Sequence, residues 1–135
     1  MSRAADLLAA HREGVRLDPD AIARCIDACL DCAQACTACA DACLSEDDVT
    51  ELIACVRLDW VCAGACESVS LALSVRAGHT ETLRALLNAC ATACRACAEE
   101  CERHARHHEH CRICAEECRA CEQACAFLLE ALDGR

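Results

Sequence analysis

The sequence predicts an all-α fold, an antiparallel up-down-up-down four-helix bundle with a thiol-lined core, and three observations support this. Eighteen of the 135 residues are cysteine, and within each cluster they recur mostly at alternating gaps of three and four residues. This spacing places them on one face of a helix that packs against a partner. One proline and four glycines leave few turns, so the helices must be long. With one Trp, one Phe and no Tyr, the core lacks its usual aromatic filling, so thiols must occupy it.

The first long helix is predicted over residues 19–44. Asp18 followed by Pro19 is typical of an N-cap with proline at the first helical position. Ile22 opens the inward stripe, and six thiols continue it: Cys25, Cys29, Cys32, Cys36, Cys39 and Cys43. Upstream, residues 2–13 can form a short extra helix. We therefore divide the chain into an N-terminal segment, 1–17, and a bundle, 18–135.

The second helix is predicted over residues 46–77, with Ser45 and Asp48 resembling a capping box. One face carries Leu52, Cys55, Asp59, Cys62, Cys66, Val69 and Leu73. Asp59 takes a place where a thiol is expected, and a buried unpaired carboxylate is costly. It is therefore a candidate metal ligand or proton acceptor. A second apolar stripe, Ile53, Val56 and Trp60, faces away from the thiols and predicts contact with another protomer or with the N-terminal segment.

The third and fourth helices are predicted over residues 80–103 and 107–132, with Gly78 closing the helix before them. The inward stripe of the third runs through Leu83, Leu87, Cys90, Cys94, Cys97, Cys101, His104 and His108. The inward stripe of the fourth runs through Cys111, Cys114, Cys118, Cys121, Cys125, Leu128 and Leu132. The turn between these two helices falls within residues 103–110.

The up-down order makes the two ends of the bundle chemically different. One end gathers aliphatic side chains into a plug: Ile22, Val69, Leu73, Leu83, Leu87, Leu128 and Leu132, with Phe127 close by. The other end carries His104, His107, His108 and His110 and forms a polar mouth. Of these, His104, His107 and His108 are candidate metal ligands alongside the eighteen thiols and Asp59.

A lining of thiols selects soft metal ions, namely Cu(I), Zn(II) or iron–sulfur clusters. Rigid helices that alternate two spacings define no separate tetrahedral unit of the kind structural zinc prefers. The only proline, Pro19, is far from any cysteine, unlike the loop-borne clusters of ferredoxins. Cu(I) accepts two or three sulfur ligands, and one monovalent ion per thiolate leaves the core nearly neutral. We therefore expect Cu(I); a zinc or heavy-metal sink, an iron–sulfur electron carrier and a plain structural bundle are the alternatives.

The formal net charge of −10 argues against nucleic acid or an anionic membrane as a partner. The N-terminal residues show no secretory signal, and the apolar runs are too short to cross a bilayer. We therefore expect a cytoplasmic protein with reduced thiols. Disulfides between neighbours on one helix would strain the geometry, because their Cβ atoms lie about 5–6 Å apart.

This thiol ladder, repeated on every core helix and joined to a His-rich turn, resembles the bacterial copper storage proteins, also described as Cys-rich four-helix-bundle copper-binding proteins. The resemblance covers about residues 19–132 and favours the cytosolic branch. It implies non-enzymatic storage of many Cu(I) ions, entry at a polar mouth, homotetramers, and a copper chaperone or small thiol as donor. By this resemblance Cys43, Asp59, Cys101, His104 and His108 lie at or near the mouth.

Overall fold

The computed structural model describes residues 2–12, 17–75 and 80–134. Along the chain lie α1 (Arg3–Ala10), α2 (Pro19–Leu44), the 3₁₀ turn η1 (Val49–Leu52), α3 (Ile53–Ser74), α4 (Thr80–His104) and α5 (Glu109–Asp133). Across these ranges every regular element is helical, which confirms the predicted all-α class.

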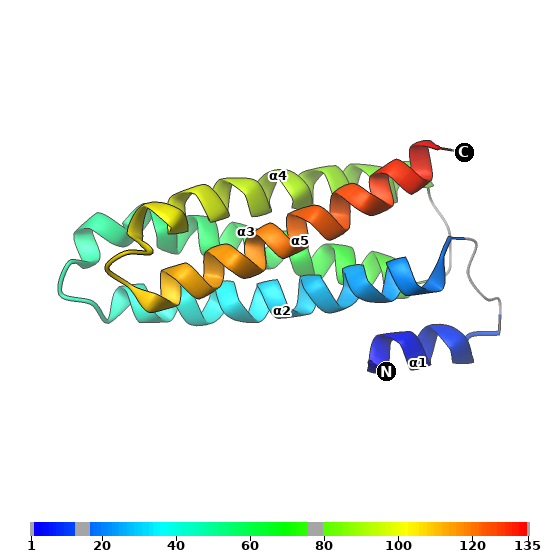
Figure 1. The fold of residues 1–135 in the computed structure, drawn as a ribbon, viewed down its shortest axis with the longest axis horizontal. Helices are drawn as coiled ribbons and strands as arrows, with labels where there is room; N and C mark the ends of the chain where they lie inside the picture. The colour runs from blue at the N-terminus through cyan, green and yellow to red at the C-terminus, as the bar shows by residue number, and fades with distance from the viewer. Residues whose placement is uncertain (1, 13–16, 76–79, 135) are drawn as a thin grey trace.

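The four long helices form an antiparallel bundle in which α2 packs against α3 and α5, and α4 packs against the same two helices. In Figure 1 the α2–α3 and α4–α5 connections lie together at the left end of the bundle. The start of α2 and the end of α5 lie at the right end. This is the predicted up-down-up-down order, and it brings the four inward stripes to one axis.

The start of α2 is the one predicted from the sequence. Asp18 is the N-cap, its carboxylate accepts a hydrogen bond from the Asp20 N–H at 3.2 Å, and Pro19 opens the helix. The predicted end at Leu44 is also correct. The predicted closing residue of the next helix, Gly78, lies outside the described residues.

The predicted start of the second helix at residue 46 is wrong. Ser45 instead caps the end of α2, where its hydroxyl donates to the Asp41 carbonyl at 3.3 Å, and α3 begins only at Ile53. The Asp48 carboxylate makes no cap and instead accepts from His108 Nε2 at 3.0 Å. The predicted capping box does not form, because its acidic residue, Asp48, instead contacts a histidine in the connection between α4 and α5.

The plug is present and shuts one end of the core. Ile22, Val69, Leu73, Leu87 and Leu128 are buried, while Leu83 and Leu132 are half-buried against them. Phe127 lies outside the plug: it is 54 % exposed, and its ring centroid lies 5.8 Å from the Arg24 guanidinium carbon.

The short helix α1 packs along α2 at the plug end of the bundle (Figure 1). The Ser2 hydroxyl caps it by accepting from the Ala5 N–H at 3.1 Å. Leu8 is buried against the bundle, whereas Leu7 points to solvent. The N-terminal segment therefore covers α2 at this end. Across the described ranges, none of the helices has the length and apolar character that spanning a bilayer requires.

Candidate metal centre

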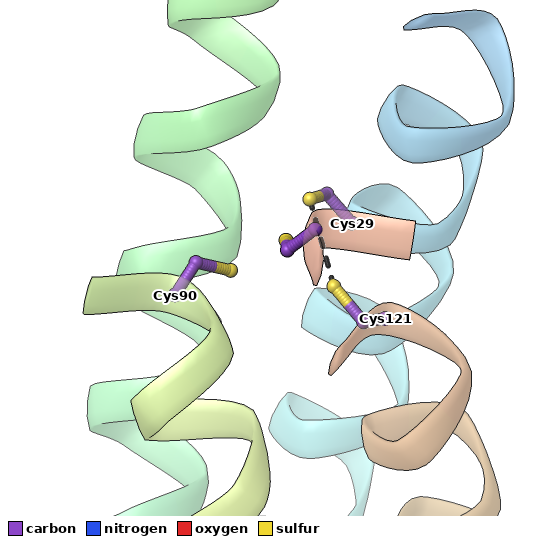
Figure 2. Close-up of side chains that lie close together, drawn as sticks. Cys29, Cys90 and Cys121 are labelled. Carbon is purple, nitrogen blue, oxygen red and sulfur yellow. Dashed lines mark hydrogen bonds between the residues drawn. The ribbon is translucent and has the colours of Figure 1, made fainter. Parts of the chain in front are cut away.

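All eighteen cysteines are buried, and all are free thiols. They come from α2, α3, α4 and α5, because each long helix turns its three- and four-residue stripe toward the bundle axis. Figure 2 shows Cys29, Cys90 and Cys121 from three different helices pointing toward a common space. The expectation that the thiols converge inside the bundle is confirmed.

Sulfur–sulfur contacts run along the bundle axis from the plug toward the mouth. Nearest the plug, Cys25 Sγ lies 3.9 Å from Cys125 Sγ, and Cys29 Sγ lies 3.6 Å from Cys121 Sγ. Farther along, Cys32 Sγ lies 3.7 Å from Cys118 Sγ. Each sulfur thus has a neighbour on another helix at a distance that one small ion can bridge.

Beyond the middle of the bundle the contacts continue to the mouth. Cys36 Sγ lies 3.7 Å from Cys114 Sγ, and Cys55 Sγ lies 3.4 Å from Cys101 Sγ. Cys39 Sγ lies 3.9 Å from Cys111 Sγ and 4.0 Å from Cys43 Sγ. On the α3–α4 side, Cys66 Sγ lies 3.8 Å from Cys90 Sγ and Cys62 Sγ lies 3.7 Å from Cys94 Sγ.

Groups of four thiols bring their sulfur atoms within 4.8 Å of one another, and these groups overlap. Cys32, Cys36, Cys118 and Cys121 each belong to two of them. A shared sulfur can bridge two ions, so the groups that these four thiols join form one continuous array rather than a row of separate four-ligand sites. The groups include Cys29–Cys90–Cys121–Cys125, Cys32–Cys66–Cys94–Cys121, Cys32–Cys36–Cys62–Cys118, Cys36–Cys97–Cys114–Cys118 and Cys39–Cys43–Cys55–Cys111.

Asp59 is the only buried charged or polar side chain among the described residues. Its Oδ1 accepts from the Cys97 thiol at 3.0 Å, from Cys114 at 3.3 Å and from Cys101 at 3.7 Å. Its Oδ2 accepts from Cys55 at 3.9 Å. No basic partner accompanies it among the buried residues, and the partners it does have are thiols.

Burial raises the pKa of Asp59 to about 9, so this carboxyl group is protonated at neutral pH. Burial likewise raises the pKa of Cys43 to about 12. Hydrogen bonds from neighbouring thiols act in the opposite direction on other groups and lower the pKa of Cys25 to about 5 and of Cys121 to about 7. A thiol that still holds its proton releases it when a metal ion binds.

One histidine joins the thiols at the mouth to the surface. His110 Nδ1 lies 3.4 Å from Cys39 Sγ, 3.6 Å from Cys111 Sγ and 4.0 Å from Cys43 Sγ. Its other nitrogen, Nε2, lies 2.9 Å from the Glu46 carboxylate. The His110 side chain is 22 % exposed. The imidazole ring of His110 is therefore partly exposed to solvent and also contacts the sulfur atoms of the core.

The three candidate histidine ligands lie elsewhere on this end of the bundle. His104 Nε2 lies 2.8 Å from the Glu100 carboxylate one turn earlier on α4. His108 places Nδ1 3.1 Å from Glu46 and Nε2 3.0 Å from Asp48. His107 is exposed. Among the histidines described at this end, the ring nitrogen hydrogen-bonded to sulfur belongs to His110.

The sequence pattern did not place His110 beside the thiols, because the inward stripe of the third helix was extended through His104 and His108. The structure ends α4 at His104 and begins α5 at Glu109, so a helical register does not run through that connection. The position of His110 directly before Cys111, the first thiol of α5, was the available signal. Glu46 had no sequence signal, because its partners lie more than sixty residues away.

The outward apolar stripe of α3 is only partly exposed. Val56 is buried, Ile53 lies at the border of exposure and Trp60 is 57 % exposed. Farther along α3, Leu71 is 67 % exposed. A Cβ atom built on Gly64, between these side chains, would meet no atom within 4 Å.

Known proteins are similar to this chain in both sequence and fold. The family described as "Copper storage protein" matches residues 18–130. The copper storage protein Ccsp of Streptomyces lividans, in a structure loaded with 10 copper equivalents, is 53 % identical, with a TM-score of 0.92 over 95 % of this chain and 98 % of that one.

Two further relatives extend the similarity. The Cu(I)-bound copper storage protein BsCsp3 is 35 % identical, with a TM-score of 0.71 over 78 % of this chain and 94 % of that one. An uncharacterised cysteine-rich protein of Bacillus subtilis, YhjQ, is 40 % identical over 75 % of this chain and 89 % of its own length. With its thiol-lined four-helix core, this chain belongs to the copper storage protein family.

Proposed function

We propose that this protein stores Cu(I) ions on the thiolates of its core, in the cytoplasm and without catalysing a reaction. The observation that carries the proposal is the overlap of the four-sulfur groups, in which thiols such as Cys32 and Cys118 belong to two groups at once. Bridging sulfur suits an ion content close to one per thiol, which Cu(I) permits because it accepts two or three ligands. The copper content of similar solved structures supports the same ion.

The charge of the core favours Cu(I) over Zn(II). Four thiolates around one Zn(II) leave two negative charges, and the described buried residues offer no basic side chain to balance them. One Cu(I) that displaces one thiol proton leaves the charge unchanged. Uncompensated charge in such an interior is costly, so a filled core of Cu(I) thiolates is the more stable arrangement.

We assign all eighteen thiols to the store and Asp59 to the sites nearest the mouth. Asp59 contacts Cys97, Cys101 and Cys114 and is neutral at pH 7. It can therefore serve as a hydrogen-bond partner of these thiols, or as an oxygen ligand once its proton leaves with an incoming ion.

Copper enters, in this proposal, at His110. An imidazole nitrogen is a weaker Cu(I) ligand than a thiolate, and its position 3.4 Å from Cys39 Sγ favours transfer inward. In this proposal His104, His107 and His108 surround the mouth but do not pass the ion from solvent to the thiols. The donor is a partner that itself holds Cu(I) on sulfur, either a copper chaperone or a small thiol.

Self-association, as a tetramer by family resemblance, is proposed along the outward face of α3. Trp60, Gly64 and Leu71 lie at spacings of four and seven residues, hence on one line of the helix. The open space around Gly64 suits the close approach of a second helix.

Titration of the reduced, metal-free protein with Cu(I) against a strong chromogenic Cu(I) chelator tests the function. We expect a plateau on the order of one ion per thiol, with no visible absorption band of an iron–sulfur cluster. A plateau at four or five ions, or Zn(II) binding as tight as Cu(I), would favour the zinc alternative. The matched control is a variant with Cys32, Cys36 and Cys118 replaced by alanine, which should lose capacity in proportion.

A further inference from the structure

Glu46 lies between two imidazoles at the mouth. Its Oε2 is 2.9 Å from His110 Nε2 and 3.1 Å from His108 Nδ1. The two rings are stacked, with centroids 5.3 Å apart. Glu46 lies in the connection that follows α2, whereas both histidines border the start of α5, so the contact joins the two connections at this end.

The Glu46 contact determines which nitrogen of His110 carries the proton. An ionised carboxylate only accepts hydrogen bonds, so the nitrogen facing it must be the donor. Glu46 is partly exposed to solvent, and a glutamate in such a place is ionised at neutral pH. In a neutral imidazole with its hydrogen on Nε2, Nδ1 has the free lone pair.

That lone pair faces the thiols. Nδ1 is the His110 atom that lies within 4.0 Å of Cys39, Cys43 and Cys111. In the opposite tautomer an N–H would point at these sulfurs, and the ring would have no free electron pair there to offer a metal ion.

We propose that Glu46 is a positioning residue for Cu(I) entry, holding His110 in the tautomer and ring orientation that present Nδ1 to the outermost thiols. This inference rests on the proposed function, since it concerns how the first ion is received. A carboxylate behind a metal-binding imidazole commonly acts this way, and its loss typically weakens metal binding 10- to 100-fold.

The neighbouring carboxylates do not share this role. Glu100 contacts the Nε2 of His104 and the guanidinium of Arg103, and neither nitrogen of the His104 ring has a described sulfur contact. Asp48 contacts His108 at Nε2, while Nδ1 of the same ring is already engaged by Glu46. Asp48 therefore supplies the matched control.

The test compares Glu46→Ala, Asp48→Ala, His110→Ala and the Glu46→Ala/His110→Ala double variant in the full chain. Imidazole ¹⁵N chemical shifts of the reduced, metal-free protein report the His110 tautomer. Transfer of the first Cu(I) from a chromogenic chelator complex reports entry. Circular dichroism checks that each variant is folded.

We expect Glu46→Ala to mix the His110 tautomers and weaken first-ion binding about 10-fold or more. Asp48→Ala should change neither measurement. In the His110→Ala background, Glu46→Ala should have no further effect, because its partner is gone.

Two results overturn the inference. One is an unchanged His110 tautomer in Glu46→Ala. The other is a Glu46→Ala effect of full size in the absence of His110. Both leave the proposed function intact if the wild-type protein still fills with Cu(I), whereas a wild-type protein that binds no Cu(I) refutes the function itself.

Discussion

Replacing Asp59 with asparagine should change how the stability of the metal-free protein depends on pH. Burial raises the pKa of this carboxyl group from an ordinary 3.8 to about 9. A group whose pKa is higher in the folded state stabilises the fold fully below its unfolded pKa. That contribution disappears as the pH rises toward the folded pKa. The relevant range is therefore about pH 4 to pH 9.

The expected magnitude follows from proton linkage. Each pH unit inside this range costs the wild-type protein about 1.4 kcal/mol, because folding must return a proton to Asp59. Between pH 5 and pH 8 the free energy of unfolding should therefore fall by up to about 4 kcal/mol more in the wild-type protein than in Asp59→Asn. Asparagine is neutral throughout, so the variant lacks this contribution.

Urea unfolding of the reduced, metal-free proteins at pH 5 and pH 8 measures the difference. Contributions from the histidines are common to both proteins and cancel in the comparison. Asp41→Asn, an exposed carboxyl group on α2, is the matched control and should follow the wild type. If Asp59→Asn and the wild type show the same pH dependence, Asp59 is ionised in the folded core and the reasoning from burial is wrong.

Three further outcomes are expected. Leu87→Ala, at a fully buried plug position, should lower the free energy of unfolding by about 2–5 kcal/mol without changing the copper capacity. A loss below about 1 kcal/mol in urea unfolding would show a loosely packed plug. Cu(I) affinity should weaken as pH falls, about 10-fold per unit for each ion that displaces one proton, as measured by chelator competition. A flat profile would mean that the thiols are already ionised. Trp60→Glu should shift the mass in sedimentation toward the 14.5 kDa of one chain, and an unchanged mass would place the interface elsewhere.

The interior of this fold could be predicted from sequence because the signal there is periodic and local. Cysteines that recur three and four residues apart share one face of a helix. The four faces, which together carry eighteen buried thiols, pack against one another around the bundle axis. Even Asp59, which breaks the thiol pattern, keeps its place in the register between Cys55 and Cys62 and is buried as expected.

The mouth could not be predicted in the same way, because it is built from connections. Extending the helical register of the third helix pointed to His104 and His108, but the helix ends at His104. The Ser45–Asp48 pattern predicted a helix start, but in the structure the Asp48 carboxylate contacts His108, which lies sixty residues later in the chain. Contacts between two connections depend on the packed bundle and have no local period in the sequence.

The chemical difference between the two ends of the core implies that copper enters and leaves by the same end. The plug closes one end with side chains such as Val69, Leu87 and Leu128, which offer an ion no ligand. At the other end His110 reaches both solvent and sulfur. From the group of thiols at the mouth, Cys55 Sγ leads to Cys101 Sγ at 3.4 Å, and the Asp59 carboxyl group links Cys101 to Cys97 and Cys114. From there, groups of thiols with their sulfur atoms within 4.8 Å of one another lead to Cys125, whose sulfur lies 3.9 Å from that of Cys25 beside the plug. Ions in the deepest sites can therefore leave only after those nearer the mouth have moved. The proposed donor and any acceptor must meet the same surface around Glu46 and His110.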